Sequence, residues 1–196
     1  MICECGTAPN PSAAERSAIR LALTLNVAMF LIGAVVGYLA DSTGVIADSL
    51  DMMTDAVGYA LALMAITRGE AFKRNSARWT GSVLVVLGGG IAIEAIRRGF
   101  VGSEPIGVAM MAYSLVSFAV NLYVLTRLAR YRKGEVHLRA SYICTRADVI
   151  ANIAVFISGA IVALTRFAIV DLVVGFAIGV YVLREALEIF REANGG

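Results

Sequence analysis

The sequence has few charged residues and long stretches that contain none. Charged side chains make up 16% of the chain and hydrophobic ones 59%, whereas a soluble globular domain carries about 25% charged residues. The mean hydropathy is +0.77, and the charges gather in short segments between long apolar runs. These features exclude a soluble domain and are typical of a protein that crosses the membrane several times.

Cysteine, histidine and the common catalytic motifs are also scarce. The chain has three cysteines, an odd number, and two of them are expected on the cytoplasmic side, where thiols stay reduced, so we expect no disulfide framework. The sequence contains no P-loop, GxGxxG, HExxH or nucleophile-elbow pattern. We therefore expect neither an enzyme nor a bound cofactor. The net charge of +2 gives no reason to expect nucleic-acid binding.

Six apolar segments are long enough to cross a bilayer, which needs about 20 residues per helix. They lie at residues 17–40, 44–67, 80–97, 106–126, 140–164 and 168–190. We predict an all-α fold, in which residues 16–191 form a bundle of six transmembrane helices between an N-terminal segment 1–15 and a short tail 192–196. The N-terminal residues lack the apolar stretch of a signal peptide, so the first span is expected to act as the insertion signal.

The basic residues favour one orientation of this bundle. Most of the 17 lysines and arginines lie before the first span, around the end of the sixth, or in the loops 68–79 and 127–139. Arg97, Arg98 and Arg166 fall on the opposite side. Because cytoplasmic loops carry the excess of positive charge, both termini are expected in the cytoplasm. Short loops and the missing targeting peptide favour the inner membrane of a bacterial cell.

Acidic side chains lie inside two of the apolar spans. Asp51 and Asp55 of the second span are four positions apart, as are Cys144 and Asp148 of the fifth, so each pair lies on one face of its helix. A carboxylate at membrane depth is costly unless it is paired, hydrated or bound to a cation, which makes it a candidate functional residue. The two spans run in opposite directions, which brings the pairs together near mid-bilayer. The pattern predicts a site for one divalent metal ion.

Each of these assignments has an alternative. The three aspartates could instead be protonated or paired inside the bundle. Arg146 is the obvious partner, but it lies two positions from Asp148 and so points to the other side of the same helix. Cys144 is as readily a small packing residue as a metal ligand.

Other polar residues of the spans are candidates to support this site. Asp48 lies one turn before Asp51 and is expected to hydrogen-bond to the ligands rather than to bind the metal. Asn26, Asn121 and Asn152 are expected to form hydrogen bonds between helices. Asn152 could also lend a neutral oxygen to the metal.

Three further residues are weaker candidates outside the spans. His137 lies in a basic loop and is more readily a solvated residue than a ligand, although a neutral imidazole could capture an entering cation. Cys3 and Cys5 could hold a soft metal, but two thiols are usually too few for a stable site.

The segment 42–55, STGVIADSLDMMTD, resembles the second-helix signature of the cation diffusion facilitator family, in which His or Asp is followed four residues later by Asp. Asp51 and Asp55 occupy these positions. The fifth helix of that family has a similar pair, and Cys144 and Asp148 occupy it here, with Cys144 where His or Asp is usual. The resemblance covers the whole membrane domain.

The resemblance implies export of divalent transition metals from the cytoplasm, chiefly zinc, in exchange for protons by alternating access. It also implies a homodimer with an independent metal path in each protomer. Asp171, which opens the sixth span, fits the same family pattern. The cytoplasmic C-terminal domain and the histidine-rich loop usual in that family are absent from this sequence. Cys144 in place of a titratable residue leaves the metal preference and the proton count open.

Two other functions stay open from the residues alone. A membrane scaffold or assembly subunit could pair its buried acids with basic residues of a partner protein, and would bind no metal when purified. A proton or monovalent-cation channel would give a conductance that needs no metal. If a metal does bind, three carboxylates and a sulfur suit zinc, cadmium or cobalt better than magnesium or calcium.

Replacing Cys144 by serine is expected to shift the metal preference away from cadmium toward harder ions, because a thiolate ligand favours soft metals. The measurement compares cadmium and zinc uptake by the wild type and by Cys144→Ser in proteoliposomes. An unchanged ratio of the two uptake rates would identify Cys144 as a packing residue.

Overall fold

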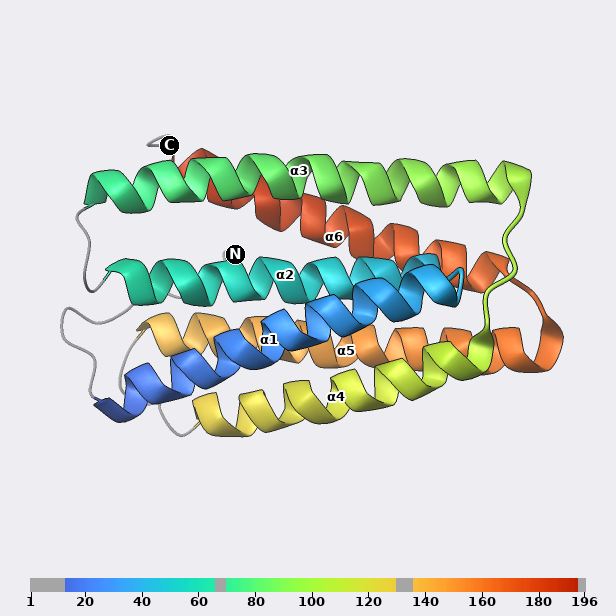
Figure 1. Cartoon of the computed structure of the whole chain (residues 1–196), viewed down its shortest axis with the longest axis horizontal. Helices are drawn as coiled ribbons and strands as arrows, with labels where there is room; N and C mark the ends of the chain where they lie inside the picture. The colour runs from blue at the N-terminus through green and yellow to red at the C-terminus, as the bar shows by residue number, and fades with distance from the viewer. Residues whose placement is uncertain (1–12, 66–69, 130–135, 194–196) are drawn as a thin grey trace.

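The computed structural model describes residues 13–65, 70–129 and 136–193. These residues form six helices and no strand. In chain order the helices are α1 (Ala13–Leu39), α2 (Thr43–Ala65), α3 (Glu70–Val101), α4 (Gly107–Ala129), α5 (Val136–Thr165) and α6 (Ile169–Ala193). The predicted all-α bundle is confirmed (Figure 1).

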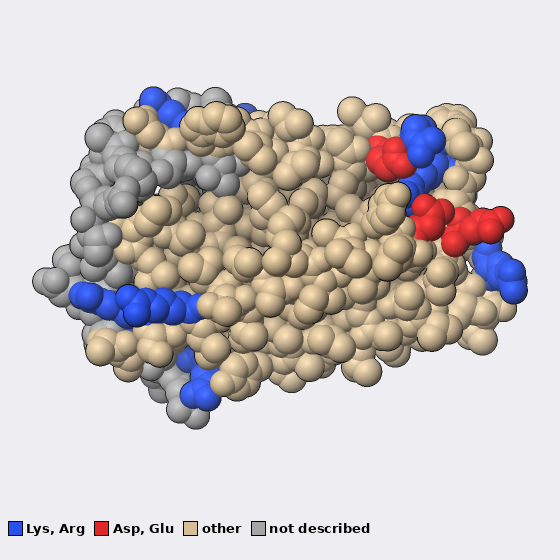
Figure 2. Space-filling view, viewed as in Figure 1, with Lys and Arg blue, Asp and Glu red and all other residues tan. Residues whose placement is uncertain are grey.

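All six helices are long enough to span a bilayer. Even α2 and α4, with 23 residues each, are about 34 Å long at 1.5 Å per residue, more than the roughly 30 Å of a hydrocarbon core. Among the described residues, only α1, α4 and α5 also contain a stretch that is apolar enough on composition alone. Figure 2 shows a wide uncharged band along the bundle with charged side chains at its two ends.

Two helices extend beyond the predicted spans at the basic end of the bundle. The hydropathy of the sequence predicts a loop over 68–79, whereas α3 already begins at Glu70. Similarly, α5 begins at Val136 rather than at 140. A helix that leaves the hydrocarbon needs no apolar surface, and the Glu, Ala, Lys and Arg residues of this part of α3 favour helix. Hydropathy therefore locates the membrane part of a helix but not its end in water.

Neighbouring helices pack in pairs around a central one. The largest contacts are those of α3 with α6, α4 with α5, and α1 with α2. Of the six described helices, α2 alone contacts each of the others. The helix with three aspartates is therefore the one most completely surrounded by protein.

Glycines allow the helices around α2 to approach closely. A Cβ atom on Gly37 of α1 would lie 2.7 Å from Cγ1 of Ile46, and one on Gly175 of α6 would lie 2.7 Å from the backbone carbonyl carbon of Thr43. Both glycines belong to GxxxG pairs, which mark close helix packing in membranes. Gly37 and Gly175 thus set the distance of α1 and α6 from α2.

Gly175→Ala is expected to lower the thermal stability of the purified protein. The added methyl group would meet the backbone of Thr43 and Gly44, which cannot rotate away, and overpacking of this kind costs about 1–3 kcal/mol. Gly90→Ala is the matched control, because a Cβ there meets nothing within 4 Å. Equal unfolding temperatures for the two variants in detergent would contradict the close packing of α6 on α2.

Candidate metal-binding site

The predicted aspartates lie on facing sides of two helices in contact, α2 and α5. Asp51 and Asp148 are each 3% exposed, and Asp55 is half-buried. The side chains of Asp51 and Asp55 both lie within hydrogen-bonding reach of Asp148. The structure thus brings together the three carboxyl groups that the sequence pattern placed near mid-bilayer.

These carboxyl groups have few other partners. Arg97, Arg98, Glu94 and Asp41 form ion pairs at one end of the bundle, and these pairs include none of the three aspartates. Oδ2 of Asp148 is buried without a hydrogen-bond partner. Three convergent acids are costly to bury in ionised form, and a proton or a bound cation would offset that cost.

The described side chains do not form a complete metal cage. Within them, no group of three or more His, Cys, Asp or Glu residues is spaced to hold a metal ion. The carboxyl groups of Asp51 and Asp55 lie near enough to that of Asp148 to act on it. Cys144, the fourth predicted ligand, lies in α5, but its side chain is outside the described part of the structure.

The other weaker candidates lie beyond what the structure describes. Arg146 and His137 belong to α5, but their side chains, like that of Cys144, are outside the described part of the structure. Cys3 and Cys5 precede the described residues altogether. Their predicted roles stay predictions.

Two asparagines form a different hydrogen bond from the predicted one. The amide nitrogens of Asn26 and Asn152 donate to the carbonyls of Ala22 and Asp148, each at 2.9 Å and one turn earlier in the same helix. The prediction of hydrogen bonds between helices is wrong for these two amide groups, because the carbonyl one turn back is always within reach. The Oδ1 atoms of both residues remain buried and unpartnered.

Asp48 bonds to α4 rather than to the aspartate cluster, and Asn121 lies within α4. Asp48 is fully buried, and its Oδ2 accepts a hydrogen bond from Ser117 of α4 at 3.4 Å. The hydroxyl of Tyr113 of the same helix is near enough to act on Asp48, but it is buried without a hydrogen-bond partner. Asn121 belongs to α4 and is buried with its Nδ2 unpartnered. The hydrogen bonds of Asp48 in the described structure therefore do not reach the predicted ligands.

α6 adds two residues that the sequence analysis missed. The charge of Glu185 is near enough to act on that of Asp51, and the hydroxyl of Tyr181 donates to Oε1 of Glu185 at 2.8 Å. The signal was available in principle, since the two residues stand four apart on one helix face. Both residues lie near the end of an apolar span, where an acid can face either the headgroups or the interior.

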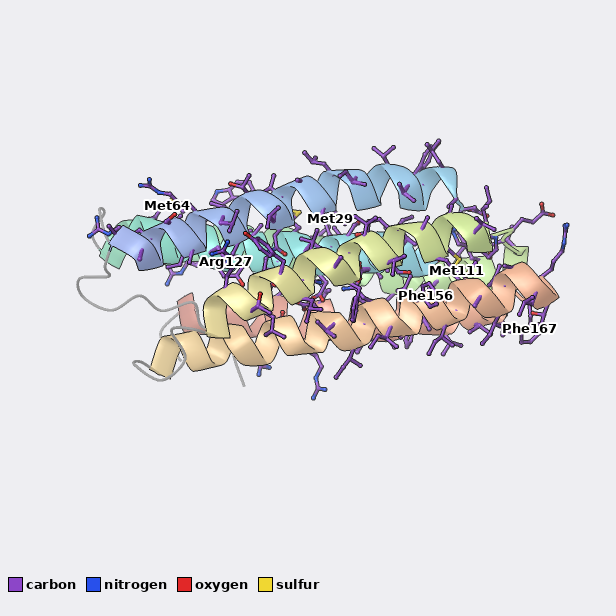
Figure 3. The ribbon with its side chains drawn as sticks, turned by 90° about the horizontal axis from the view of Figure 1, so that it is seen from below. Met29, Met64, Met111, Arg127, Phe156 and Phe167 are labelled. Carbon is purple, nitrogen blue, oxygen red and sulfur yellow. The ribbon has the colours of Figure 1, made fainter. Side chains whose placement is uncertain are left out.

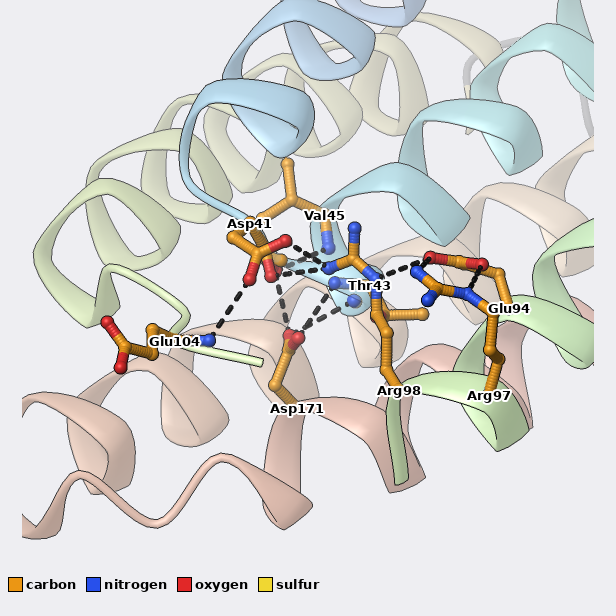
Figure 4. A network of polar contacts seen from close by, with 10 residues as sticks. Asp41, Thr43, Val45, Glu94, Arg97, Arg98, Glu104 and Asp171 are labelled. Atoms are coloured by element: carbon orange, nitrogen blue, oxygen red, sulfur yellow. Dashed lines mark hydrogen bonds and ion pairs between the residues drawn. The ribbon is translucent and has the colours of Figure 1, made fainter. Parts of the chain in front are cut away.

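Asp171 holds the beginning of α2 at the far end of the bundle (Figure 4). Its carboxylate is fully buried and accepts hydrogen bonds from the hydroxyl of Ser42 at 2.7 Å and the backbone N–H groups of Thr43 and Gly44 at 2.7 and 3.0 Å. Ser42 in turn accepts from the N–H of Val45 at 3.1 Å. A carboxylate is well suited to a helix N-terminus, where N–H groups lack partners and the helix dipole is positive.

A second polar network ties neighbouring segments together at the same end. The guanidinium of Arg98 in α3 bonds both Oδ1 and the backbone carbonyl of Asp41 at 2.7 Å. Nε of Arg98 also pairs with Oε1 of Glu94 at 2.9 Å, and Glu94 pairs with Arg97 as well. The other oxygen of Asp41 accepts from the N–H of Glu104 at 3.0 Å. Asp41 itself has a left-handed backbone with φ of 51°, a conformation that aspartate tolerates better than most residues.

Comparisons with known proteins find relatives of this chain. A family model described as the cation efflux transmembrane domain matches residues 19–194. The chain is similar to the metal cation efflux system protein CzcD of Cupriavidus metallidurans, with 25% identity over 89% of this chain and 58% of that protein. It is also similar to the zinc transporter ZitB of Yersinia pseudotuberculosis, with 23% identity over 88% of this chain and 60% of that protein.

A third relative has a more detailed name. The cadmium, cobalt and zinc/H(+)-K(+) antiporter of Bacillus subtilis is 21% identical over 92% of this chain and 62% of that protein. The chain thus spans about three-fifths of the length of these relatives.

Asp171→Ala is expected to lower the unfolding temperature of the detergent-solubilised protein. Loss of a helix cap costs about 0.5–2 kcal/mol, and each buried N–H left without a partner adds about 1–3 kcal/mol. Glu104→Ala is the control, because its exposed side chain lies at the same end of the bundle. An equally small change for both variants would show that the carboxylate is not needed to hold α2.

Proposed function

The chain belongs to the cation efflux family. On this premise we propose that it exports zinc, or the similar divalent ions cadmium and cobalt, from the cytoplasm in exchange for protons. The observation that carries the proposal is the convergence of Asp51, Asp55 and Asp148 in the interior of the bundle. These groups come from two helices, two of them are almost fully buried, and the ion pairs of Arg97 and Arg98 do not include them.

The ligand types support a transition metal as the substrate. Zinc is held tetrahedrally by carboxylate oxygen and thiolate sulfur, and Cys144 would supply the sulfur. Magnesium and calcium require more oxygen ligands than this cluster offers. The name of the Bacillus relative, with cadmium, cobalt and zinc as its metals, supports the same class of substrate.

Proton exchange follows from the cost of burying charge. Metal binding requires deprotonated ligands, so a metal that enters from the cytoplasm releases protons there. The proximity of the carboxyl group of Asp148 to those of Asp51 and Asp55 suits the state in which protons occupy the site. A site that is both empty and fully ionised would be too costly to bury, which favours strict exchange of metal for protons.

Alternating access requires that only one end of the bundle be open at a time. The polar contacts of Asp171 with α2 and of Arg98 with Asp41 support a state that is closed at the end opposite the basic one. Opening there would require these contacts to break or to move as one body with α2. We further propose a homodimer without enzymatic activity, as expected for this family.

Asp55→Asn is expected to abolish metal transport while the protein stays folded, because the amide cannot be ionised to balance the metal charge. The measurement is zinc and cadmium uptake into proteoliposomes under an imposed pH gradient. Glu104→Gln, an exposed acid outside the cluster, should transport like the wild type.

The other outcomes separate the alternatives. Normal flux in Asp55→Asn would place the site elsewhere. A folded wild type without metal flux would favour the scaffold function, and a conductance that does not depend on metal would favour a channel.

A further inference from the structure

α1 and α4 leave an apolar groove between them on the surface of the bundle. The groove has a volume of about 450 Å³, and its lining includes Leu21 and Leu25 of α1 together with Val116, Ala119 and Tyr123 of α4. The two helices lie beside each other in Figure 3. In a membrane such a groove is filled by a lipid chain unless another protein segment covers it.

A basic group stands at one end of this groove. Arg127 lies one turn beyond Tyr123 on the same face of α4, and its Nη2 donates to the tyrosine hydroxyl at 2.8 Å. Its guanidinium carbon is 5.0 Å from the centre of the tyrosine ring, a cation–π distance. Tyr123 therefore holds the guanidinium at the mouth of the groove.

The guanidinium has donors left for a further ligand. Arginine carries five N–H donors in a planar fork, and the hydroxyl of Tyr123 occupies one of them. Arg127 is exposed, and no carboxylate of the described structure forms an ion pair with it. A phosphate group is the ligand that such a fork binds best, since it can accept two parallel hydrogen bonds.

The length of the groove along α4, up to Arg127, matches the thickness of one leaflet of a bilayer. The stretch of α4 from Leu115, which also lines the groove, to Arg127 is about 18 Å long at 1.5 Å per residue. Half of a hydrocarbon core is about 15 Å thick. A second copy of the chain would be expected to cover a helix along its whole length, whereas a lipid spans a single leaflet.

The charge at this end is also suitable for an anionic lipid. α4 ends and α1 begins here, and Arg20 is exposed one residue before Leu21. On the face shown in Figure 2, basic side chains of described residues lie at the corresponding end of the bundle. The positive-inside rule places this end in the cytoplasm, where the leaflet holds anionic lipids.

We propose that the groove between α1 and α4 binds one anionic phospholipid of the cytoplasmic leaflet. Its acyl chain lies along Leu21, Leu25 and Val116, and its phosphate accepts hydrogen bonds from Arg127 and Tyr123. The apolar groove binds the chain of any phospholipid, and Arg127 selects the headgroup. This site is separate from the aspartate cluster and does not depend on which ion the protein transports.

The test is native mass spectrometry of the purified full chain with equal amounts of phosphatidylglycerol and phosphatidylcholine of the same acyl chains. The wild type should retain phosphatidylglycerol preferentially. Arg127→Gln should lower that preference about tenfold, as expected for the loss of hydrogen bonds to a charged group. Arg184→Gln is the matched control, because Arg184 is an exposed arginine in the half of α6 toward the same end, and it should keep the preference.

A second variant tests the groove itself. Val116→Trp should fill it and reduce retention of both lipids, with the helix content and monodispersity of the protein unchanged. An unchanged preference in Arg127→Gln, or an equal loss in Arg184→Gln, would overturn the proposal in favour of general surface charge. Displacement of the lipid by inorganic phosphate would show that the headgroup binds alone, and loss of a dimer in Val116→Trp would show that a second copy covers the groove.

Discussion

The structure depends on the cost of burying carboxyl groups in a membrane. α2 carries Asp48, Asp51 and Asp55 along one helix, and none of them can face lipid without a large penalty. The face that carries them must therefore be shielded by protein, and α2 is the one described helix that contacts all five others. Close approach of the neighbours is possible only because glycines such as Gly37 and Gly175 face it. The central position of α2 thus keeps its acids away from lipid.

Most of the fold was predictable, because hydropathy reports directly on which residues meet lipid. Six spans and their order follow from the apolar runs, and the periodicity of Asp51, Asp55 and Asp148 predicts their convergence. The early start of α3 at Glu70 was not predictable in this way, since a helix in water has no hydropathy signal. Glu185 was missed for a related reason, because an acid near the end of a span has the same pattern whether it faces the headgroups or the interior.

The hydrogen bonds of buried polar side chains were the least predictable part of the site. Sequence position shows that such a group needs a partner but not which partner is nearest. Asn26 and Asn152 use the carbonyl one turn back in their own helices, whereas Asp171 reaches across to the first N–H groups of α2. The difference is geometric, since a helix beginning offers several unpaired donors and the middle of a helix offers none. The hydrogen bonds of Asp171 to the start of α2 could therefore be identified only from the packed structure.

The two ends of the bundle are built differently, and this difference bears on how a buried site can exchange its contents. At one end Asp171 holds α2 directly, and Arg98 ties the preceding turn to α3. Because the carboxylate caps the first turn of α2, the start of that helix and the start of α6 are expected to move as one body. Asp51 and Asp55 lie on the same rigid helix, so any such motion also shifts them relative to Asp148 on α5. Under the proposed function, opening of the site and the change in its ligand geometry would then be one event, in which the metal loses its ligands as the path out is formed.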